Sequence, residues 1–351
     1  MTKKREIPLA LIFGGVGCER EISVKSAEGL YRALKKAGGR IFPTFISPLG
    51  EWFLAKDEKT SPQALAKDPE ALADKVYPKR IGKDGGFSTD REFIKIGAAI
   101  PILHGDFGED GRIQGALDTA GIPFVGCPVE ASAICRNKAI LKAVLKNHGM
   151  PMLDWIVIPK GDSLDAAISR AEAALGYPMF VKPTSLGSSI GAGPAREQCE
   201  LRQRLESARA VADDIIIERY LAKKRELECA FFEYKSKRYF TIPGEICYDA
   251  EFYDYESKYI SGDARMLAST TASPEICDVV RNRSAKVADI VGLRHFARID
   301  FLLDEDGEVY FNEINTIPGL TEASLFPLMI KGSGVDLGEL FLDLSRAAQT
   351  K

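Results

Sequence analysis

The sequence has few histidines and no closely spaced pair of cysteines. Only three of its 351 residues are histidines, His104, His148 and His295, which argues against a metal site built from several imidazoles. The seven cysteines are scattered and form no Cys-x-x-Cys pair. Their odd number and spacing favour the reduced thiols of a cytoplasmic protein over a disulfide framework or a zinc site.

The sequence also lacks a long apolar run and a strong net charge. No stretch of about 18 apolar residues is present, so no transmembrane helix is expected. The basic start Met1–Arg5 precedes the apolar run Ile7–Phe13, but that run ends at two glycines without a small-residue cleavage site, so we expect a buried strand there and not a signal peptide. A formal net charge of −3 offers no field that would attract nucleic acid or an anionic membrane.

The sequence does have the alternation of strands and helices that is typical of an α/β protein. In its first part, the pattern predicts strands at Leu9–Phe13, Ile41–Ile46 and Ala98–Leu103, and a helix at Ser23–Ala37. We expect them to form an open parallel sheet, in which ligands bind at the carboxyl ends of the strands. The polar stretch from Lys56 to Glu92 is expected to be irregular.

A candidate phosphate-binding loop follows in the second part. Lys182 ends the predicted strand Met179–Lys182, and the small residues of Gly187–Gly191 would let backbone amides approach phosphate oxygens. The pattern is not G-x-x-x-x-G-K-[ST], so a P-loop NTPase is not indicated, and a plain turn remains an alternative. Lys138, just before the predicted helix Ala139–Asn147, is either a second phosphate ligand or a surface lysine.

The most informative segment is a predicted antiparallel hairpin of the strands Ala297–Leu303 and Val309–Ile314. Alternation along the strands places Arg298 on the same face as three oxygen donors, namely Asp300, Glu313 and Asn315. Carboxylate and amide oxygens without nitrogen or sulfur ligands suit Mg²⁺. The alternative is a solvated polar face.

Three further polar segments have both a functional and a structural interpretation. Glu19 and Glu21 follow the first strand, where they would hold a substrate ammonium group or complement the helix dipole. His104 begins a tight polar loop at the ligand edge of the sheet. The aromatic and charged stretch Phe252–Tyr259 is either a surface strand or a lid over the site.

Taken together and in order, these segments resemble D-alanine–D-alanine ligases over nearly the whole chain. The matching stretches are FGGVGCEREIS (Phe13–Ser23), LHGDFGEDGRIQG (Leu103–Gly115), FVKPTSLGSSIG (Phe180–Gly191), FYDYESKY (Phe252–Tyr259), and RIDF with NEINTIPGLTEASLFP (within Arg298–Pro327). The resemblance implies an α/β ATP-grasp fold of three domains, expected at residues 1–126, 127–221 and 222–351, and a homodimer. It also implies D-alanine as substrate, ATP, and two Mg²⁺ ions for which Mn²⁺ can substitute.

The resemblance assigns a nucleotide site to five positions. Lys138 and Lys182 would hold the ATP phosphates, Glu218 and Leu221 would meet the adenine, and Glu226 would meet the ribose.

The same resemblance assigns the substrate side of the site. Glu19 would bind the ammonium group of the first D-alanine and His104 would orient that substrate. Ser324 would receive the carboxylate of the second. Arg298 and the amide of Gly319 would stabilise the oxyanion that forms between the two.

The remaining positions implied by the resemblance belong to the metal and the lid. Asp300, Glu313 and Asn315 would bind magnesium. Ser188 and Tyr259 would join Glu19 to latch the lid, and Lys258 would approach the phosphates or the second carboxylate.

The sequence departs from the family pattern at several positions. Gly17 replaces a serine, Gly193-Pro194 replaces a lysine after the phosphate loop, and Ser269-Thr270 replaces Pro-Ala. The usual Met-Asp-Lys reads Arg136-Asn137-Lys138, and Lys223-Lys224 replaces a short glycine turn. These changes leave the metal and oxyanion residues intact but affect nucleotide affinity and the second substrate.

Two other functions remain as alternatives. A non-catalytic nucleotide-binding protein of the same fold could lose Arg298 or a metal carboxylate, yet all are present. A ligase with D-serine or D-lactate as acceptor would keep the reaction. Tyr259 argues against the hydroxy acid, since the depsipeptide ligases of this type lack the tyrosine-rich lid, whereas D-serine ligases keep a similar one.

Overall fold

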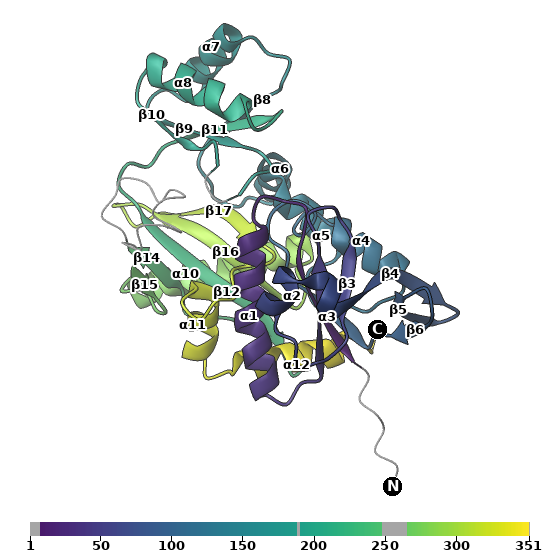
Figure 1. Cartoon of the computed structure of the whole chain (residues 1–351). Coiled ribbons are helices and arrows are strands. Elements are labelled where there is room, and N and C mark those ends of the chain that lie inside the picture. Colours follow the sequence, from purple (N-terminus) through teal and green to yellow (C-terminus); the bar gives the residue numbers. More distant parts are fainter. Residues whose placement is uncertain (1–7, 188–189, 248–264, 351) are drawn as a thin grey trace.

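The computed structural model describes residues 8–187, 190–247 and 265–350 and consists of three β-sheets that follow one another along the chain (Figure 1). The first sheet has the order β6-β5-β4-β3-β2-β1-β7. Its strands are β1 (Leu9–Gly14), β2 (Ile41–Ile46), β3 (Trp52–Ala55), β4 (Ala73–Ile81), β5 (Asp84–Ser88), β6 (Phe93–Lys95) and β7 (Ala98–Pro101).

The first sheet is mixed and not simply parallel. Strands β2, β1 and β7 are parallel, as predicted, but β3 to β6 extend the sheet with antiparallel pairings. The stretch from Lys56 to Glu92, predicted to be irregular, therefore contains β4, β5 and two short helices, α2 (Pro62–Lys67) and α3 (Pro69–Leu72).

The prolines and glycines of this stretch misled the prediction because they occupy positions that regular elements tolerate. Pro62 and Pro69 open the two helices directly after Ser61 and Asp68, whose side chains cap the helix amides, and Pro78 lies within β4. Gly82 makes the turn between β4 and β5 at φ 59°.

The second and third sheets are antiparallel. The second has the order β10-β9-β11-β8, with β8 (Trp155–Ile158), β9 (Met179–Pro183), β10 (Gly193–Ala195) and β11 (Ile215–Arg219). The third has the order β15-β14-β12-β16-β17, with β13 paired to β12. Its strands are β12 (Arg225–Tyr234), β13 (Lys237–Phe240), β14 (Gly244–Cys247), β15 (Arg265–Leu267), β16 (Phe296–Leu303) and β17 (Val309–Asn315). The predicted hairpin is β16–β17.

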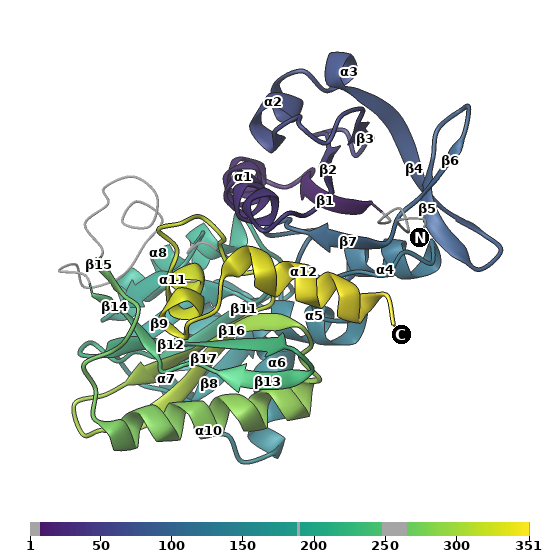
Figure 2. The same ribbon diagram turned by 90° about the horizontal axis from the view of Figure 1, so that it is seen from below.

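Helices connect the sheets into a single body. Besides α2 and α3 they are α1 (Arg20–Lys36), α4 (Arg112–Thr119), α5 (Val129–Arg136), α6 (Lys138–Asn147), α7 (Leu164–Ala174), α8 (Gln198–Arg209), α10 (Pro274–Val291), α11 (Leu325–Gly332) and α12 (Leu337–Ala348). Figure 2 shows α12 between the first and third sheets, while α10 covers the opposite face of the third. None of the helices among the described residues has the length and apolar character needed to cross a bilayer.

One apolar core joins the first sheet to the third. It contains residues of β1, α1 and β7 together with Phe232, Phe296, Phe326 and Phe341. Helix α12 approaches α1 closely at Gly338, where an added Cβ would lie 2.2 Å from the carbonyl oxygen of Ala33. A second core packs α5, α6 and α10 on the other face of the third sheet, and a separate core lies beneath α7 and α8. The three domain boundaries given above remain proposals.

Candidate functional site

The candidate site is a cavity of about 530 Å³ bordered by the second and third sheets, by helix α1 and by the loops that follow β1 and β7 of the first sheet. Every site residue that the family resemblance assigns and the structure describes lines this cavity, whereas Glu21 is exposed in the first turn of α1 and does not. The assigned residues that line it are Glu19, His104, Lys138, Lys182, Glu218, Leu221, Glu226, Arg298, Asp300, Glu313, Asn315, Gly319 and Ser324. The predicted lid Phe252–Tyr259, with Lys258 and Tyr259, and the loop residue Ser188 lie outside the described residues.

The hairpin β16–β17 carries the predicted magnesium ligands as expected. Asp300 pairs with Glu313, and Arg298 pairs with Asn315, so the four side chains share a face. Phe301 and Phe311 are buried and pack edge-to-face, with their ring centroids 6.0 Å apart. The hairpin is therefore anchored on one face while its polar face borders the cavity.

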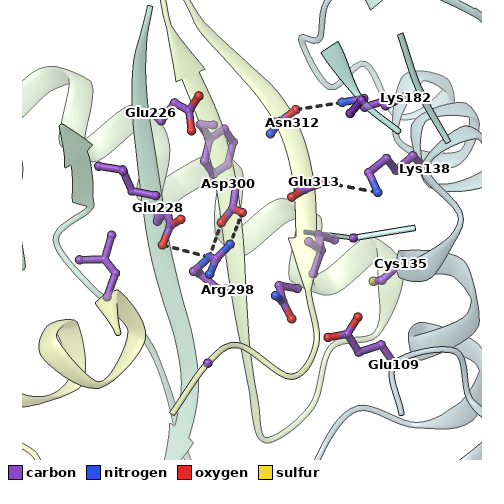
Figure 3. Close-up of a pocket in the computed structure, with 18 of the residues that line it drawn as sticks. Glu109, Cys135, Lys138, Lys182, Glu226, Glu228, Arg298, Asp300, Asn312 and Glu313 are labelled. Atoms are coloured by element: carbon purple, nitrogen blue, oxygen red, sulfur yellow. Dashed lines mark hydrogen bonds and ion pairs between the residues drawn. The ribbon is translucent and has the colours of Figure 1, made fainter. Parts of the chain in front are cut away.

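Arg298 is held between two carboxylates (Figure 3). Its Nε and Nη2 donate to the two oxygens of Asp300 at 2.8 and 2.7 Å, and Nε lies 3.0 Å from Glu228 Oε2. Burial alone would lower the pKa of Arg298, but Asp300 and Glu228 raise it well above its usual value. The arginine fork is fixed, and the formal charges of the group Glu228–Arg298–Asp300 sum to −1, although burial raises the pKa of Asp300.

A second charge cluster, Lys142–Glu218–Lys182, lies on the side of the second sheet. Glu218 of β11 accepts ion pairs from Lys142 Nζ at 2.7 Å and Lys182 Nζ at 2.8 Å. Burial would raise the pKa of Glu218, yet the two lysines outweigh it and lower the pKa to about 2. Burial lowers the pKa of Lys142, whereas Glu218 and Glu313 raise that of Lys182 against the effect of burial. This cluster keeps one net positive charge.

The two clusters meet across the cavity. Lys138 Nζ lies 3.6 Å from Glu313 Oε2 and donates to the carbonyl oxygen of Leu186 at 2.8 Å. Lys182 Nζ donates to Asn312 Oδ1 of β17 at 3.4 Å. Figure 3 shows both lysines reaching toward β17 from the opposite wall. Lys138 is therefore buried and directed at the site, and its alternative interpretation as a surface lysine is wrong.

Glu19 and His104 lie together on the side of the first sheet. Glu19 precedes α1 but makes no side-chain cap hydrogen bond, so helix capping does not explain it. Gly105 has φ 72°, and an added Cβ there would lie 2.3 Å from Glu19 Oε2, so glycine is required for Glu19 to pack here. His104 is buried, with Nε2 2.9 Å from Ser26 Oγ and Nδ1 3.7 Å from Glu109 Oε1.

Gly319 and Ser324 form the remaining edge of the cavity. An added Cβ at Gly319 would lie 3.1 Å from Ser324 Oγ. That hydroxyl lies 2.7 Å from Thr321 Oγ1 and does not cap α11. Glu226 and Leu221 line the cavity near Lys224, whose Nζ is 3.9 Å from Glu226 Oε1.

The donor set of the hairpin fits magnesium, although it does not enclose an ion by itself. Asp300 and Glu313 supply carboxylate oxygens from paired positions, and Asn315 supplies an amide oxygen. In the chain segments that the structure covers, no group of three or more histidine, cysteine, aspartate or glutamate side chains is placed to hold a metal. A magnesium ion here would complete its coordination with phosphate and water oxygens, which is its usual mode of binding.

Several polar residues at the site were not assigned a role from the sequence. Glu228, Asn312, Arg136 and Glu109 line the cavity, and Lys142 binds Glu218 behind it. Two of them had a detectable signal. Lys142 lies four residues after Lys138 on the same helix face, and Glu228 lies two residues after Glu226 on the same strand face. Glu109 and Asn312 belong to stretches that carry the family resemblance, and Arg136 is one of the departures from the family pattern.

Comparison with known proteins agrees with this geometry. Residues 8–127 match the family described as "D-ala D-ala ligase N-terminus", and residues 144–345 match "D-ala D-ala ligase C-terminus". The chain is 33% identical to the D-alanine--D-alanine ligase of Streptococcus equi subsp. zooepidemicus over 97% of its own length and 95% of the relative. It is 35% identical to the D-alanine--D-alanine ligase of Caldicellulosiruptor bescii over 97% of its own length and 93% of the relative.

Two solved structures are similar to the whole chain. The D-alanine-D-alanine ligase from Coxiella burnetii superposes with a TM-score of 0.85 at 28% identity, covering 98% of this chain and 94% of the other. The VanG D-Ala:D-Ser ligase from Enterococcus faecalis superposes with a TM-score of 0.86 at 29% identity, covering 96% of this chain and 98% of the other. The chain therefore belongs to the D-alanine–D-alanine ligase family, ATP-grasp enzymes whose ligase reaction serves peptidoglycan synthesis.

Proposed function

We propose that this enzyme joins two molecules of D-alanine into D-alanyl-D-alanine, with ATP converted to ADP and phosphate. The observation that carries the proposal is the pair of oppositely charged clusters that face one cavity. The positive cluster around Glu218 suits the triphosphate, and the negative cluster around Arg298 suits divalent cations.

The first half of the reaction activates a carboxylate. Lys138 and Lys182 hold the phosphates of ATP, while Glu19 binds the ammonium group of the first D-alanine and His104 orients it. A carboxylate oxygen of that substrate attacks the γ-phosphorus, and ADP leaves. Asp300, Glu313 and Asn315 would hold Mg²⁺, which neutralises charge on the phosphates when bound.

The second half forms the peptide bond. The amine of the second D-alanine, whose carboxylate is received by Ser324, attacks the acyl phosphate, and inorganic phosphate leaves. Arg298 and the backbone N–H of Gly319 stabilise the oxyanion of the tetrahedral intermediate. A preorganised donor of this kind contributes about 3 to 4 kcal/mol.

An acceptor screen tests the proposal. The protein is incubated with ATP, Mg²⁺ and D-alanine, alone and with D-serine or D-lactate, and is scored by product mass and phosphate release; L-alanine is the stereochemical control. D-Alanyl-D-alanine as the main product supports the proposal. ATP binding without any ligation product would identify a nucleotide-binding protein instead.

D-Serine is the second candidate acceptor, because the VanG D-Ala:D-Ser ligase is as similar in structure as the D-alanine ligase from Coxiella burnetii. If D-alanyl-D-serine exceeds D-alanyl-D-alanine at equal concentrations of both amino acids, D-serine is the preferred acceptor. The use of ATP places the proposed activity in the cytoplasm. The expected homodimer rests on the family resemblance and is checked by light scattering.

A further inference from the structure

Arg136 is the last residue of α5, at the position where the family pattern has methionine, and it is almost buried. Its side chain is 9% exposed, yet it carries a full charge. Nη1 donates to Glu109 Oε2 at 3.1 Å and Nη2 donates to Asp106 Oδ1 at 3.0 Å. Both carboxylates belong to the loop after β7, so the guanidinium ties that loop to the end of α5.

This arginine also borders the place where the first substrate is proposed to bind. A Cβ added to Gly187 would lie 3.4 Å from Arg136 Nη1 and 4.0 Å from Glu19 Oε2. A side chain at Gly187 would therefore meet both the guanidinium and Glu19, and, against the effect of burial, the charge of Glu19 is among those that raise the pKa of Arg136. Both residues line the cavity.

A line of polar contacts runs from Arg136 through the site. Glu109 binds the guanidinium with Oε2, which leaves Oε1 3.7 Å from His104 Nδ1. His104 Nε2 lies 2.9 Å from Ser26 Oγ, and that hydroxyl accepts from the backbone N–H of Leu320 at 3.4 Å. The carboxylate of Glu109 therefore lies between the guanidinium and the ring of His104, whose other nitrogen lies against the hydroxyl of Ser26.

We propose that Arg136 is a positioning residue for the first D-alanine, acting through Glu109 on His104 and through charge balance on Glu19. The inference rests on the proposed function and extends it to a residue in which this chain departs from the family pattern. The fork holds Glu109 in one orientation, with its other carboxylate oxygen 3.7 Å from Nδ1 of His104.

Without the guanidinium, three carboxylates are left close to the ammonium site: Glu19, Asp106 and Glu109. The side chain of Glu109 could then rotate, and the carboxylates of Asp106 and Glu109 would compete with Glu19 for the substrate ammonium group. The effect falls on capture of the first D-alanine and not on ATP, whose phosphates are assigned to Lys138 and Lys182.

The test isolates the first substrate by replacing the second with hydroxylamine. Its nitrogen attacks the acyl carbon of the acyl phosphate, phosphate leaves, and D-alanyl hydroxamate is measured. For Arg136→Met we expect the KM for D-alanine in this assay to rise at least tenfold, while the KM for ATP changes less than about threefold. Arg136→Lys keeps the charge but holds one carboxylate at a time, so it restores part of the loss.

A matched control comes from the same loop region. Arg112 pairs with Asp110 at 3.5 Å, stacks on Phe107 and is 61% exposed. Arg112→Met makes the same chemical change outside the cavity lining and is expected to leave both KM values unchanged. Glu109→Gln keeps Arg136 paired with Asp106 and should reproduce the D-alanine defect, which keeps the test informative if Arg136→Met folds poorly.

The outcomes separate this inference from the proposed function. A wild-type protein that makes neither hydroxamate nor dipeptide from D-alanine overturns the proposed function. An active wild type whose Arg136→Met and Glu109→Gln variants keep the D-alanine KM within twofold overturns the role of Arg136 alone. A defect that falls equally on D-alanine and ATP would mean that Arg136 merely supports the fold.

Discussion

The two charge clusters of the cavity have opposite compositions. In one, Lys142 of α6 and Lys182 of the second sheet surround one glutamate, and in the other, two carboxylates of the third sheet surround one arginine. By formal charge, the two lysines around Glu218 leave an excess of one positive charge, and the two carboxylates around Arg298 leave an excess of one negative charge. Buried charges are costly unless paired, so pairing lets the fold carry these groups while the unmatched charge remains for ligands.

The clusters differ in the geometry of their cations. Lysine ammonium groups are compact point charges on flexible stems, which suits phosphates in several positions. The planar fork of Arg298 binds Asp300 through two parallel hydrogen bonds, which fixes its direction. We therefore expect changes in the lysine cluster to affect stability and nucleotide binding, and changes around Arg298 to affect turnover.

The largest effect is expected at Glu313, where the two clusters meet. Glu313→Gln removes a charge from the proposed magnesium site, so turnover should fall at least about a thousandfold, or roughly 4 kcal/mol. Phosphate release and dipeptide mass measure the loss. Glu308→Gln, an exposed change at the turn of the same hairpin, is the control. Wild-type turnover of Glu313→Gln at limiting Mg²⁺ would show that the metal site is misassigned.

The next effect is on stability, at the centre of the lysine cluster. Glu218→Gln leaves Lys142 and Lys182 without their shared carboxylate, and breaking a buried pair in this way costs about 3 to 5 kcal/mol. Urea unfolding at neutral pH measures it. Glu305→Gln, which breaks an exposed pair with Lys223, should change stability by less than about 1 kcal/mol. Equal losses for both variants would contradict the assigned role of burial.

Acid should remove the contribution of Glu218 in a defined pH range. Its pKa is about 2 in the folded protein and 4.5 for an ordinary glutamate, so the unfolded chain binds the proton first. The stabilisation is fully present above about pH 4.5 and is lost as the pH falls toward 2. The stability difference between wild type and Glu218→Gln should therefore shrink across this range. A constant difference down to pH 2 would exclude the carboxylate charge as its source.

The smallest predicted effect sharpens the comparison of arginine with lysine. Arg298→Lys keeps the charge but loses the fork, so kcat for dipeptide formation should fall at least about tenfold, or 1.4 kcal/mol. ATP affinity, measured by direct titration, should change much less. An unchanged kcat, or a defect confined to ATP binding, would reduce Arg298 to a phosphate clamp or a structural partner of Asp300.

The sequence predicted the regular parts of the site because short periodic patterns determine them. Alternation along β16 and β17 was sufficient to place Asp300 beside Glu313, since strand pairing fixes which side chains share a face. The same reasoning failed from Lys56 to Glu92, where breaker residues occupy caps and turns of regular elements.

The charge partners were harder to predict because they come from distant segments. Glu218 was expected to meet adenine, and nothing local to β11 indicates that Lys142 and Lys182 enclose its carboxylate. Arg136 meets Asp106 and Glu109 across about thirty residues of sequence. Such contacts depend on how the three sheets are assembled, which periodicity does not encode.

The packing of α12 against α1 bears on how the chain is made on the ribosome. The core beneath the first sheet contains Leu9 at one end of the sequence and Ala348 at the other, and the close approach at Gly338 belongs to the same contact. Domains commonly fold in order of synthesis. Helix α1 packs on the same face of the first sheet, but the part that α12 covers stays exposed until residues 337–348 have left the exit tunnel. We therefore expect the nascent chain to need protection of that part of the face until α12 has emerged.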